Sequence, residues 1–321
     1  MAVKSSDLLK VYGPVPSRRL GQSLGINNIP PKICTYSCVY CQLGRTIDLQ
    51  SERRRFYDPE VILTDTERQI RKARDKDERI DFLTVVPDGE PTLDVNLGRE
   101  IRLLKSLGIK IAVIENASLL WREEVRNELS EANWVSLKVD TVTEETWRRI
   151  NRPHGALKLE TVLEGMNDFA DMFKGELTTE TMLIQGFNDS LEEVEKIADF
   201  LVELRPSKAY LAIPTRPPAE EWVRPADEQA INRAFQIFDG KLNHVEHLIG
   251  YEGNAFAFTG NVEIDLLSIS SVHPMREEGV ARLLSKAGAD WSIVEKLLRE
   301  QRFIELEYEG NTFYMRKLPS R

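Results

Sequence analysis

The 321-residue chain is predicted to be an α/β protein, with a partial barrel of six βα units followed by a small C-terminal winged helix-turn-helix module. Apolar stretches of strand length alternate with segments of helical spacing over most of the chain, which is typical of parallel βαβ units. The last sixty residues break this alternation. With 41% hydrophobic residues, the chain can bury a core of the required size.

The barrel prediction rests on six apolar stretches. They cover residues 24–29, 80–86, 109–114, 134–139, 177–184 and 209–214. Amphipathic segments such as "LEEVEKIADFLVELR" lie between most of them, so right-handed crossovers and a parallel sheet are expected. In this architecture functional side chains gather at the carboxyl ends of the strands. We expect residues 1–250 to form this core together with an N-terminal extension.

The C-terminal part is predicted to contain a linker at 251–273 and a winged module at 274–321. Two short helical segments precede an alternating hairpin that is expected to turn at Gly310 and Asn311. Residues 262–321 hold 9 Lys and Arg against 10 Asp and Glu, which supports DNA binding only weakly. A structural or substrate-presenting role for the module therefore stays open beside nucleic-acid contact.

The composition excludes several classes of protein. A formal net charge of −9 argues against a protein that coats nucleic acid, although a local basic patch is compatible with it. No apolar run approaches the roughly 18 to 20 residues that span a bilayer. The N-terminal segment lacks the apolar stretch of a signal peptide. We therefore expect a cytoplasmic protein without membrane contact.

The three cysteines of the chain, Cys34, Cys38 and Cys41, follow the first predicted strand at C-x3-C-x2-C spacing. In a reducing compartment such a cluster indicates metal binding or catalysis rather than disulfides. Three thiolates suit a [4Fe–4S] cluster whose fourth iron is open. Zinc is the alternative, but it needs a fourth ligand, and none of the four histidines stands at finger-like spacing. With no further cysteine, a second cluster held by thiolates is excluded.

The spacing C-x3-C-x-aromatic-C, with Tyr40 before Cys41, resembles the defining motif of the radical S-adenosylmethionine superfamily. The resemblance implies a partial (βα)6 TIM-like barrel in which Cys34, Cys38 and Cys41 hold the cluster. It further implies that the open iron binds S-adenosylmethionine, that reductive cleavage gives a 5′-deoxyadenosyl radical, and that a ferredoxin or flavodoxin supplies the electron. Tyr40 would pack by the adenine; a core tyrosine is the alternative.

A second motif stands at the end of the second predicted strand. "VVPDGEPT" looks like the GGEP motif of the superfamily, with Gly89, Glu90 and Pro91 matching and Asp88 replacing the first glycine. The resemblance implies that the backbone and Glu90 contact the methionine amino group of the cofactor. A carboxylate at position 88 is compatible with that cationic group.

Polar residues follow three later strands. Asn116 and Ser118 are candidates for contact with the cofactor carboxylate or ribose, and an N-cap at Ser118 is the alternative. Asp140 resembles residues that bind the ribose or face the substrate, or else it caps the following helix. Gln185 and Asn188 are candidates for cofactor or substrate contact, or for simple loop solvation.

Other loops carry candidate residues for the mouth of the barrel. Each has an equally simple structural interpretation, as a surface ion pair or a rigid return loop. These candidates are Arg18, Arg19, Arg152, His154, Thr215 and Arg216.

Longer strings, including "INRPH" and "PTRPPAEEWVRP", resemble a poorly characterised family of stand-alone radical enzymes of archaea and bacteria near the wyosine-forming tRNA enzymes. The resemblance implies an enzyme of oxidoreductase or transferase type that abstracts a hydrogen atom. We expect a macromolecular substrate, either a tRNA base or a protein side chain. A small metabolite is the alternative. An iron–sulfur DNA-binding regulator is a remote one, since it does not explain the Gly-Glu-Pro motif.

Overall fold

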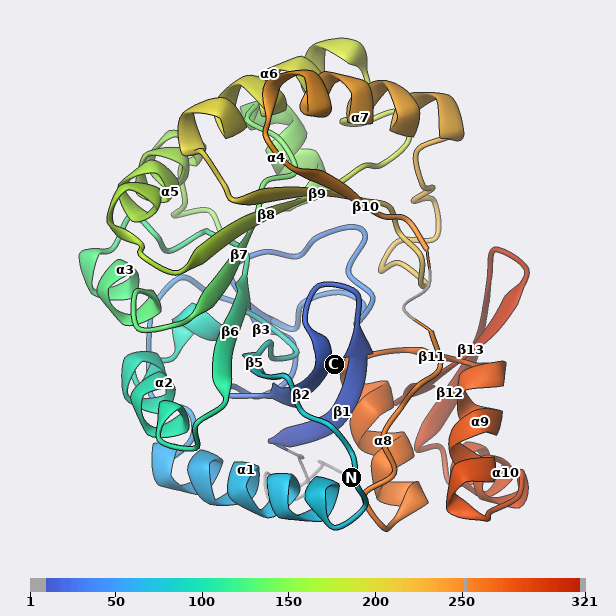
Figure 1. Cartoon of the computed structure of the whole chain (residues 1–321). Helices are drawn as coiled ribbons and strands as arrows, with labels where there is room; N and C mark the ends of the chain where they lie inside the picture. Colours follow the sequence, from blue (N-terminus) through green and yellow to red (C-terminus); the bar gives the residue numbers. More distant parts are fainter. Residues whose placement is uncertain (1–9, 251–252, 318–321) are drawn as a thin grey trace.

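The computed structural model describes residues 10–250 and 253–317 and contains an eight-stranded sheet that curls into a half-barrel (Figure 1). The strand order is β1-β2-β5-β6-β7-β8-β9-β10, with β1 antiparallel to β2 and every other neighbouring pair parallel. The strands are β1 (Val11–Ser17), β2 (Gly21–Ile26), β5 (Phe82–Val85), β6 (Lys110–Glu115), β7 (Trp134–Lys138), β8 (Glu176–Met182), β9 (Lys208–Ala212) and β10 (Val245–Leu248). The α/β prediction is confirmed.

Helices cover the outer face of this sheet (Figure 1). In α6 the side chain of Ser190 accepts a hydrogen bond from the Glu193 backbone N–H, and the helix buries the apolar stripe from Val194 to Leu204. The helices are α1 (Pro59–Arg74), α2 (Leu97–Lys105), α3 (Glu123–Leu129), α4 (Glu144–Ile150), α5 (Leu159–Met172), α6 (Leu191–Leu204) and α7 (Glu228–Lys241). Short elements β3 (Ile33–Cys34), β4 (Asp48–Leu49) and η2 (Pro91–Leu93) lie in the loops.

All six strands expected from the sequence are present, and two further strands flank them. The prediction missed β1 because Gly13, Pro14 and Pro16 disfavour a strand. As an edge strand, however, β1 can contain proline without breaking a central ladder. It also missed β10, which has four residues and a mixed polar pattern. The first predicted strand was placed about three residues too late, and its end belongs to the loop that leads to the cysteines.

The C-terminal part holds helices and a three-stranded sheet of order β11-β13-β12. Its elements are α8 (Val262–Val272), β11 (Met275–Arg276), α9 (Glu277–Ala287), α10 (Ser292–Arg299), β12 (Phe303–Tyr308) and β13 (Asn311–Arg316). Helix α8 lies inside the segment expected to be a linker. The hairpin turns one residue earlier than predicted, at Glu309 and Gly310, whose φ angles are 48° and 69°. Two positive φ angles suit a two-residue hairpin turn, and Asn311 already pairs with Tyr308.

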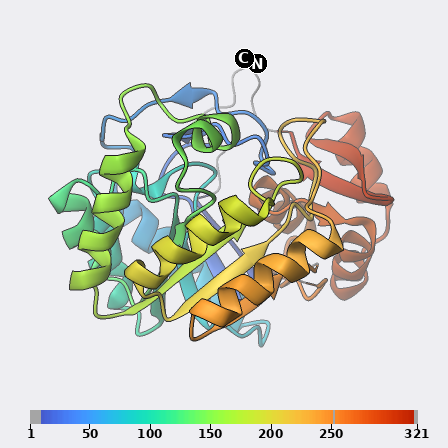
Figure 2. The same ribbon diagram turned by 90° about the horizontal axis from the view of Figure 1, so that it is seen from above.

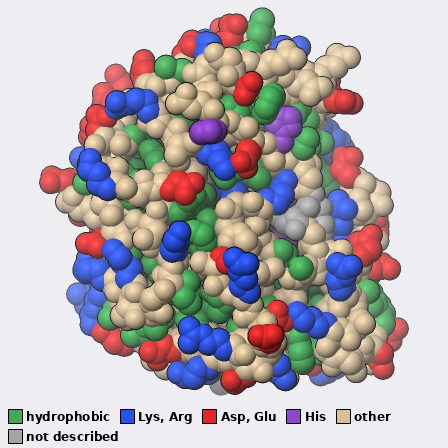
Figure 3. Space-filling model, in the orientation of Figure 1, with side chains coloured by type: hydrophobic (Ala, Val, Ile, Leu, Met, Phe, Trp, Pro, Cys, Tyr) green, Lys and Arg blue, Asp and Glu red, His purple; other side chains and the backbone are tan. Residues whose placement is uncertain are grey.

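The C-terminal part packs against the edge of the half-barrel (Figure 2). Its apolar core contains Leu266, Leu283 and Phe303, together with Tyr12 and Val15 of β1. This shared core joins the two parts through buried apolar surface. In the described ranges no helix combines the length and apolarity needed to cross a bilayer. The face shown in Figure 3 carries basic and acidic side chains interspersed.

Candidate functional site

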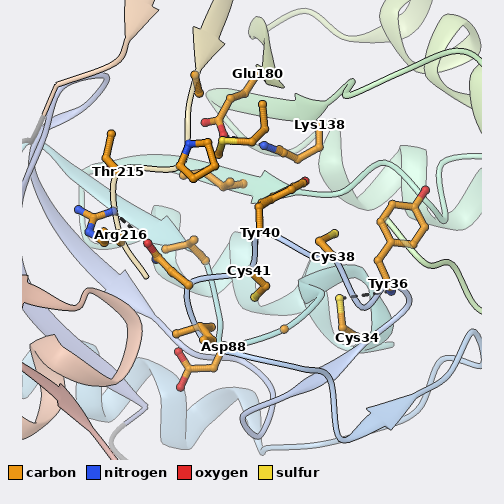
Figure 4. Close-up of a pocket in the computed structure, with 18 of the residues that line it drawn as sticks. Cys34, Tyr36, Cys38, Tyr40, Cys41, Asp88, Lys138, Glu180, Thr215 and Arg216 are labelled. Atoms are coloured by element: carbon orange, nitrogen blue, oxygen red, sulfur yellow. Dashed lines mark hydrogen bonds and ion pairs between the residues drawn. The ribbon is translucent and has the colours of Figure 1, made fainter. Parts of the chain in front are cut away.

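A cavity of about 350 Å³ opens at the carboxyl ends of the parallel strands (Figure 4). The last residues of four neighbouring strands, Lys138, Met182, Ala212 and Leu248, line it. Cys34, Cys38 and Cys41 line the same cavity, and we call these three residues the thiol wall. Tyr40, Asp88 and Gly89 also line it, so both sequence motifs meet at one place.

The loop that carries the cysteines is fixed on one side by the "DGEP" segment. The Lys32 backbone N–H donates to the Asp88 carbonyl at 2.6 Å, and the Glu90 N–H donates to the Ile33 carbonyl at 3.1 Å. A Cβ atom on Gly89 would lie 1.9 Å from that Ile33 carbonyl oxygen. Glycine is therefore required at position 89 because the two backbones cross there.

On its other side the loop is fixed by the "INRPH" segment. The Ser37 N–H donates to the Asn151 carbonyl at 3.0 Å, and the His154 N–H donates to the Thr35 carbonyl at 2.8 Å. The Arg152 guanidinium instead pairs with Glu220. Neither Arg152 nor His154 lines the cavity. These residues scaffold the cysteine loop rather than contact a ligand.

Two side-chain amides reach the thiols. Asn116 Nδ2 lies 3.5 Å from Cys34 Sγ, and Asn151 Nδ2 lies 3.5 Å from Cys38 Sγ. Burial raises the pKa of the Cys38 thiol to about 12 and raises that of Cys34 well above its usual range. Thiols with a raised pKa ionise when a metal cation replaces the proton. Asn116, a candidate for cofactor contact, lies against the Cys34 thiol.

The donor set of this wall fits a [4Fe–4S] cluster. Its three thiols belong to one loop, and no histidine is found among the described residues that line the cavity. Across residues 10–250 and 253–317, no three Cys, His, Asp or Glu side chains converge on a single metal ion. Three thiolates of one loop can each bind a separate iron of a cluster, whereas a structural zinc site needs a fourth protein ligand. Three thiolates would leave one iron of the cluster open.

The two carboxylates of "DGEP" point to different places. Glu90 is 1% exposed and does not line the cavity. Its Oε1 accepts from the Thr92 N–H at 2.9 Å, and its Oε2 accepts from the Asn116 N–H at 2.9 Å. Pro91 begins η2 and is likewise buried away from the cavity. Glu90 therefore joins the ends of β5 and β6 rather than facing a ligand.

Asp88 is the carboxylate that lines the cavity. It is 3% exposed, and its Oδ1 has no hydrogen-bond donor among the described residues. Burial raises the pKa of Asp88 to about 8, although the charges of Arg316 and Lys32 act in the opposite direction. The residue that departs from the expected motif is thus the one placed to meet a donor group of a ligand.

Tyr40 lies beside the cysteines (Figure 4), and its hydroxyl belongs to a buried polar cluster. Its hydroxyl donates to Asp140, which also accepts from Asn151 Nδ2 at 2.7 Å and from the Met182 N–H at 2.9 Å. Asp140 does not line the cavity, and the N-cap residue of α4 is Thr143. Asp140 therefore holds Tyr40 and Asn151 by hydrogen bonds without facing the cavity. The alternative that Asp140 caps α4 is wrong.

Charged residues form a second wall, which sequence reasoning largely missed. Lys138 Nζ lies 2.8 Å from Glu180, and Arg19 lies 2.6 Å from the same carboxylate. We call Arg19, Lys138 and Glu180 the charged wall; all three line the cavity. Figure 4 shows Lys138 and Glu180 on the side of Tyr40 away from the cysteines. A lysine and a glutamate within otherwise buried strands were the available signal.

The charges of this wall stabilise one another. Burial alone would raise the pKa of Glu180, but Lys138 and Arg19 lower it to about 2. Burial would lower the pKa of Lys138, but Asp140 and Glu180 raise it. The Lys138 ammonium also lies 4.9 Å from the centroid of the Tyr40 ring. Glu180 is ionised and paired without any ligand.

Three other predicted residues lie outside the cavity. Ser118 is buried and donates to Thr35 Oγ1 at 2.7 Å, and α3 begins only after Arg122, so Ser118 is no N-cap. Asn188 is buried and closes the loop after β8 by donating to the Met182 carbonyl. Gln185 is exposed. The Ser118 and Asn188 side chains therefore hold loops in place, and Gln185 lies at the surface.

Arg18, Thr215 and Arg216 line the cavity, as the sequence suggested. Arg216 donates to Gln42 Oε1 at 3.0 Å and contacts His273 at the end of α8 at 2.9 Å. The Tyr308 hydroxyl donates to the Pro214 carbonyl at 3.1 Å. The loop after β9 therefore connects the cysteine loop to the C-terminal part.

Comparison with known proteins finds a family model and relatives that match this chain. The family model described as Radical SAM superfamily matches residues 28–201. A UPF0026 protein of Methanocaldococcus jannaschii is 50% identical over 313 residues, covering 97% of each chain.

Solved structures agree in fold. A radical SAM methyltransferase from Sphaerobacter thermophilus aligns with a TM-score of 0.57 at 16% identity, over 71% of this chain and 66% of that one. TYW1 with a lysine-pyruvate adduct bound aligns with a TM-score of 0.50 at 18% identity, over 70% of this chain and 76% of that one. The chain thus spans about two thirds of the methyltransferase and three quarters of TYW1.

Proposed function

Since the chain belongs to the radical SAM superfamily, we propose that Cys34, Cys38 and Cys41 hold a [4Fe–4S] cluster with one open iron for S-adenosylmethionine. The observation that carries this proposal is a single cavity lined by three thiols of one loop. When bound, the cluster and S-adenosylmethionine supply a 5′-deoxyadenosyl radical that abstracts a hydrogen atom from the substrate. The reductant we propose is a ferredoxin or flavodoxin.

The residues of the chain then position the cofactor and exclude water. Asp88 and the backbone of Gly89 accept hydrogen bonds from the amino group of S-adenosylmethionine, a role that the family resemblance gave to Glu90. Tyr40 provides an apolar ring face for the adenine. Lys138 and Glu180 offer a donor and an acceptor side by side, which suits ribose hydroxyl groups. Glu90 and Asp140 do not line the cavity, and their hydrogen bonds to neighbouring residues keep these groups in position.

We propose a macromolecular substrate, of which only the reacting group enters the cavity. A volume of about 350 Å³ is near the lower end for one ligand, and S-adenosylmethionine must share it. Outside the cavity, Trp222 is 45% exposed and stacks on Phe187 with 5.2 Å between ring centroids. The Arg149 guanidinium lies 4.6 Å from the Phe187 ring centroid. Phe187 packs on the apolar cluster that also touches Tyr40.

An exposed tryptophan stacked on a half-buried phenylalanine beside a guanidinium is a surface on which an unstacked nucleobase can stack. We therefore favour a tRNA base over a protein side chain as the substrate group. In this proposal the C-terminal helices and hairpin act as a winged helix-turn-helix that docks the RNA beside the cavity. The contact between Tyr308 and Pro214 supports that arrangement, because it connects the hairpin to the cavity rim.

The test uses anaerobically reconstituted, reduced protein with S-adenosylmethionine and quantifies 5′-deoxyadenosine. Bulk tRNA, protein extract and the small-molecule pool of a source cell are added in parallel. We expect tRNA to stimulate product formation above the uncoupled rate. Stimulation by protein extract or by small molecules instead would overturn the RNA assignment. A complete absence of 5′-deoxyadenosine would overturn the reaction class.

The aromatic pair is tested by two matched variants. Trp222→Ala should lower the tRNA-dependent part of product formation about tenfold, in line with the energy of one base stack. Trp121→Ala removes a similarly exposed tryptophan elsewhere and should leave the stimulation unchanged. Equal effects of the two variants would remove the support for a stacking surface.

A further inference from the structure

We infer that Asn116 and Asn151 set the reduction potential of the cluster by donating N–H hydrogen bonds to Cys34 and Cys38. The inference rests on the proposed cluster and deepens it, since it assigns control of electron uptake to two particular side chains. The amides approach the cysteine loop from different elements. Asn116 follows β6 and Asn151 follows α4.

The nitrogen of Asn116 is the atom that faces the thiol. Its Oδ1 accepts a hydrogen bond from the Ser118 backbone N–H at 3.0 Å, which fixes the amide orientation. Its Nδ2 donates to Thr35 Oγ1 at 2.8 Å and lies 3.5 Å from Cys34 Sγ. An amide nitrogen carries two hydrogens, so both contacts can be made at once.

Asn151 is oriented by a charged acceptor. Its Nδ2 donates to Asp140 Oδ2 at 2.7 Å. A carboxylate can only accept a hydrogen bond, so the amide nitrogen and not the amide oxygen must face Asp140. The same nitrogen lies 3.5 Å from Cys38 Sγ, and the residue is 3% exposed. Burial keeps water from competing for either acceptor, which strengthens these hydrogen bonds.

The donor to the third thiol, Cys41, is a backbone N–H rather than an asparagine side chain. Cys41 is contacted by the backbone N–H of Leu43, and the charges of Lys32 and Lys138 act on it. A substitution cannot remove a backbone donor, whereas the two asparagines can be replaced. The asparagines are therefore two replaceable amide donors to the thiols.

The electrostatic consequence has a definite sign. Reduction adds one electron to the cluster, and an N–H dipole aimed at a cluster thiolate stabilises the more negative state. Two such donors raise the reduction potential relative to a cluster without them. They ease electron uptake from a weak biological reductant.

The test compares Asn116→Leu and Asn151→Leu with Asn188→Leu. Leucine keeps a similar size and cannot donate. Asn188 is a buried amide that donates to the Asp140 and Met182 carbonyls and has no thiol contact among the described residues. Iron and sulfide content are measured first. The midpoint potential of each reconstituted protein is then followed by electron paramagnetic resonance.

We expect the midpoint potential to become more negative in both thiol variants, further so in the double variant, and to be unchanged in Asn188→Leu. Unchanged potentials in both thiol variants with full iron content, or an equal shift in the control, would overturn the inference. If a leucine variant does not fold, serine at the same position replaces it, because its short hydroxyl does not reach the thiol. A wild-type protein without four irons would instead overturn the proposed function itself.

Discussion

The thiol wall is held by neutral amide donors, whereas the charged wall on the other side of Tyr40 is built from ions that pair with one another. Glu180 already has two cationic partners, so the charged wall is complete before any ligand binds. The thiols are half-buried, protonated and without a cationic side chain in direct hydrogen-bond contact among the described residues. The thiols therefore lack a balancing charge until a metal cluster binds, whereas the charges of the other wall already balance one another before a ligand arrives.

Removal of one thiol is the strongest test of this difference between the two walls. Cys38→Ala should abolish cluster assembly, because the two remaining thiolates cannot hold the cluster. The free energy of unfolding of the apo protein should change by only about 1 kcal/mol. Iron and sulfide analysis, with urea unfolding of the apo protein, measures both effects. Full iron content and retained cleavage of S-adenosylmethionine in this variant would refute the ligand assignment.

On the charged wall the larger effect should be on stability. Glu180→Gln leaves the half-buried Lys138 and Arg19 cations without their main partner and should cost about 3 kcal/mol in free energy of unfolding. The control is Asp171→Asn, which breaks an exposed pair with Arg205 and should cost less than about 0.5 kcal/mol. Both values come from urea unfolding of apo protein. Equal costs would show that the charged wall is not a stabilising element.

The pH dependence of stability should have opposite signs at Asp88 and Glu180. The folded-state pKa of Asp88, about 8, lies above its unfolded value of about 3.9, so this residue favours the unfolded state increasingly as pH rises through that window. Glu180, with a pKa of about 2, stabilises the fold above its unfolded value of about 4.3 and loses that contribution as pH falls toward 2.

Asp88→Asn tests this sign directly. Relative to wild type, the variant should gain on the order of 3 to 4 kcal/mol between pH 5 and pH 8, because each pH unit in this window contributes about 1.4 kcal/mol. Urea unfolding of the apo proteins at the two pH values measures the difference. A variant that loses stability relative to wild type as pH rises would contradict the buried position of the Asp88 carboxylate beside Lys32 and Arg316.

The smallest expected effect concerns the connection between the cavity rim and the C-terminal hairpin. Tyr308→Phe removes one hydrogen bond to the Pro214 carbonyl and should cost about 0.5 to 1.5 kcal/mol. Thermal or urea unfolding of the apo protein measures it. A cost above about 3 kcal/mol would mean that this hairpin carries far more of the stability of the cavity rim than its single contact indicates.

The sequence predicted the six central strands and the cysteine motif because both are local patterns. The period of the apolar residues and the spacing of the cysteines are visible in the sequence itself. The carboxyl ends of parallel strands must then lie at one edge of the sheet. It did not predict β1, since proline is acceptable there only because β1 lies at the edge of the sheet. Edge position is a property of the assembled sheet and leaves no mark in a short segment.

Side-chain direction within the site was also beyond the sequence. Glu90 turns away from the cavity because Thr92 and Asn116 supply its donors, and Asn116 stands 26 positions later. Asn151 was noted only as part of "INRPH", yet it meets Cys38 across 113 positions. Partners so far apart along the chain are decided by tertiary packing, which local spacing does not reveal.

The central claim is that three thiolates of one loop hold a four-iron cluster with one open iron. Mössbauer spectroscopy of the anaerobically reconstituted, iron-57-labelled protein, with and without S-adenosylmethionine, tests it most directly. The account predicts four irons per chain, of which one changes its spectrum when S-adenosylmethionine is added. A single mononuclear metal per chain, or a four-iron spectrum that S-adenosylmethionine leaves unchanged, would contradict it.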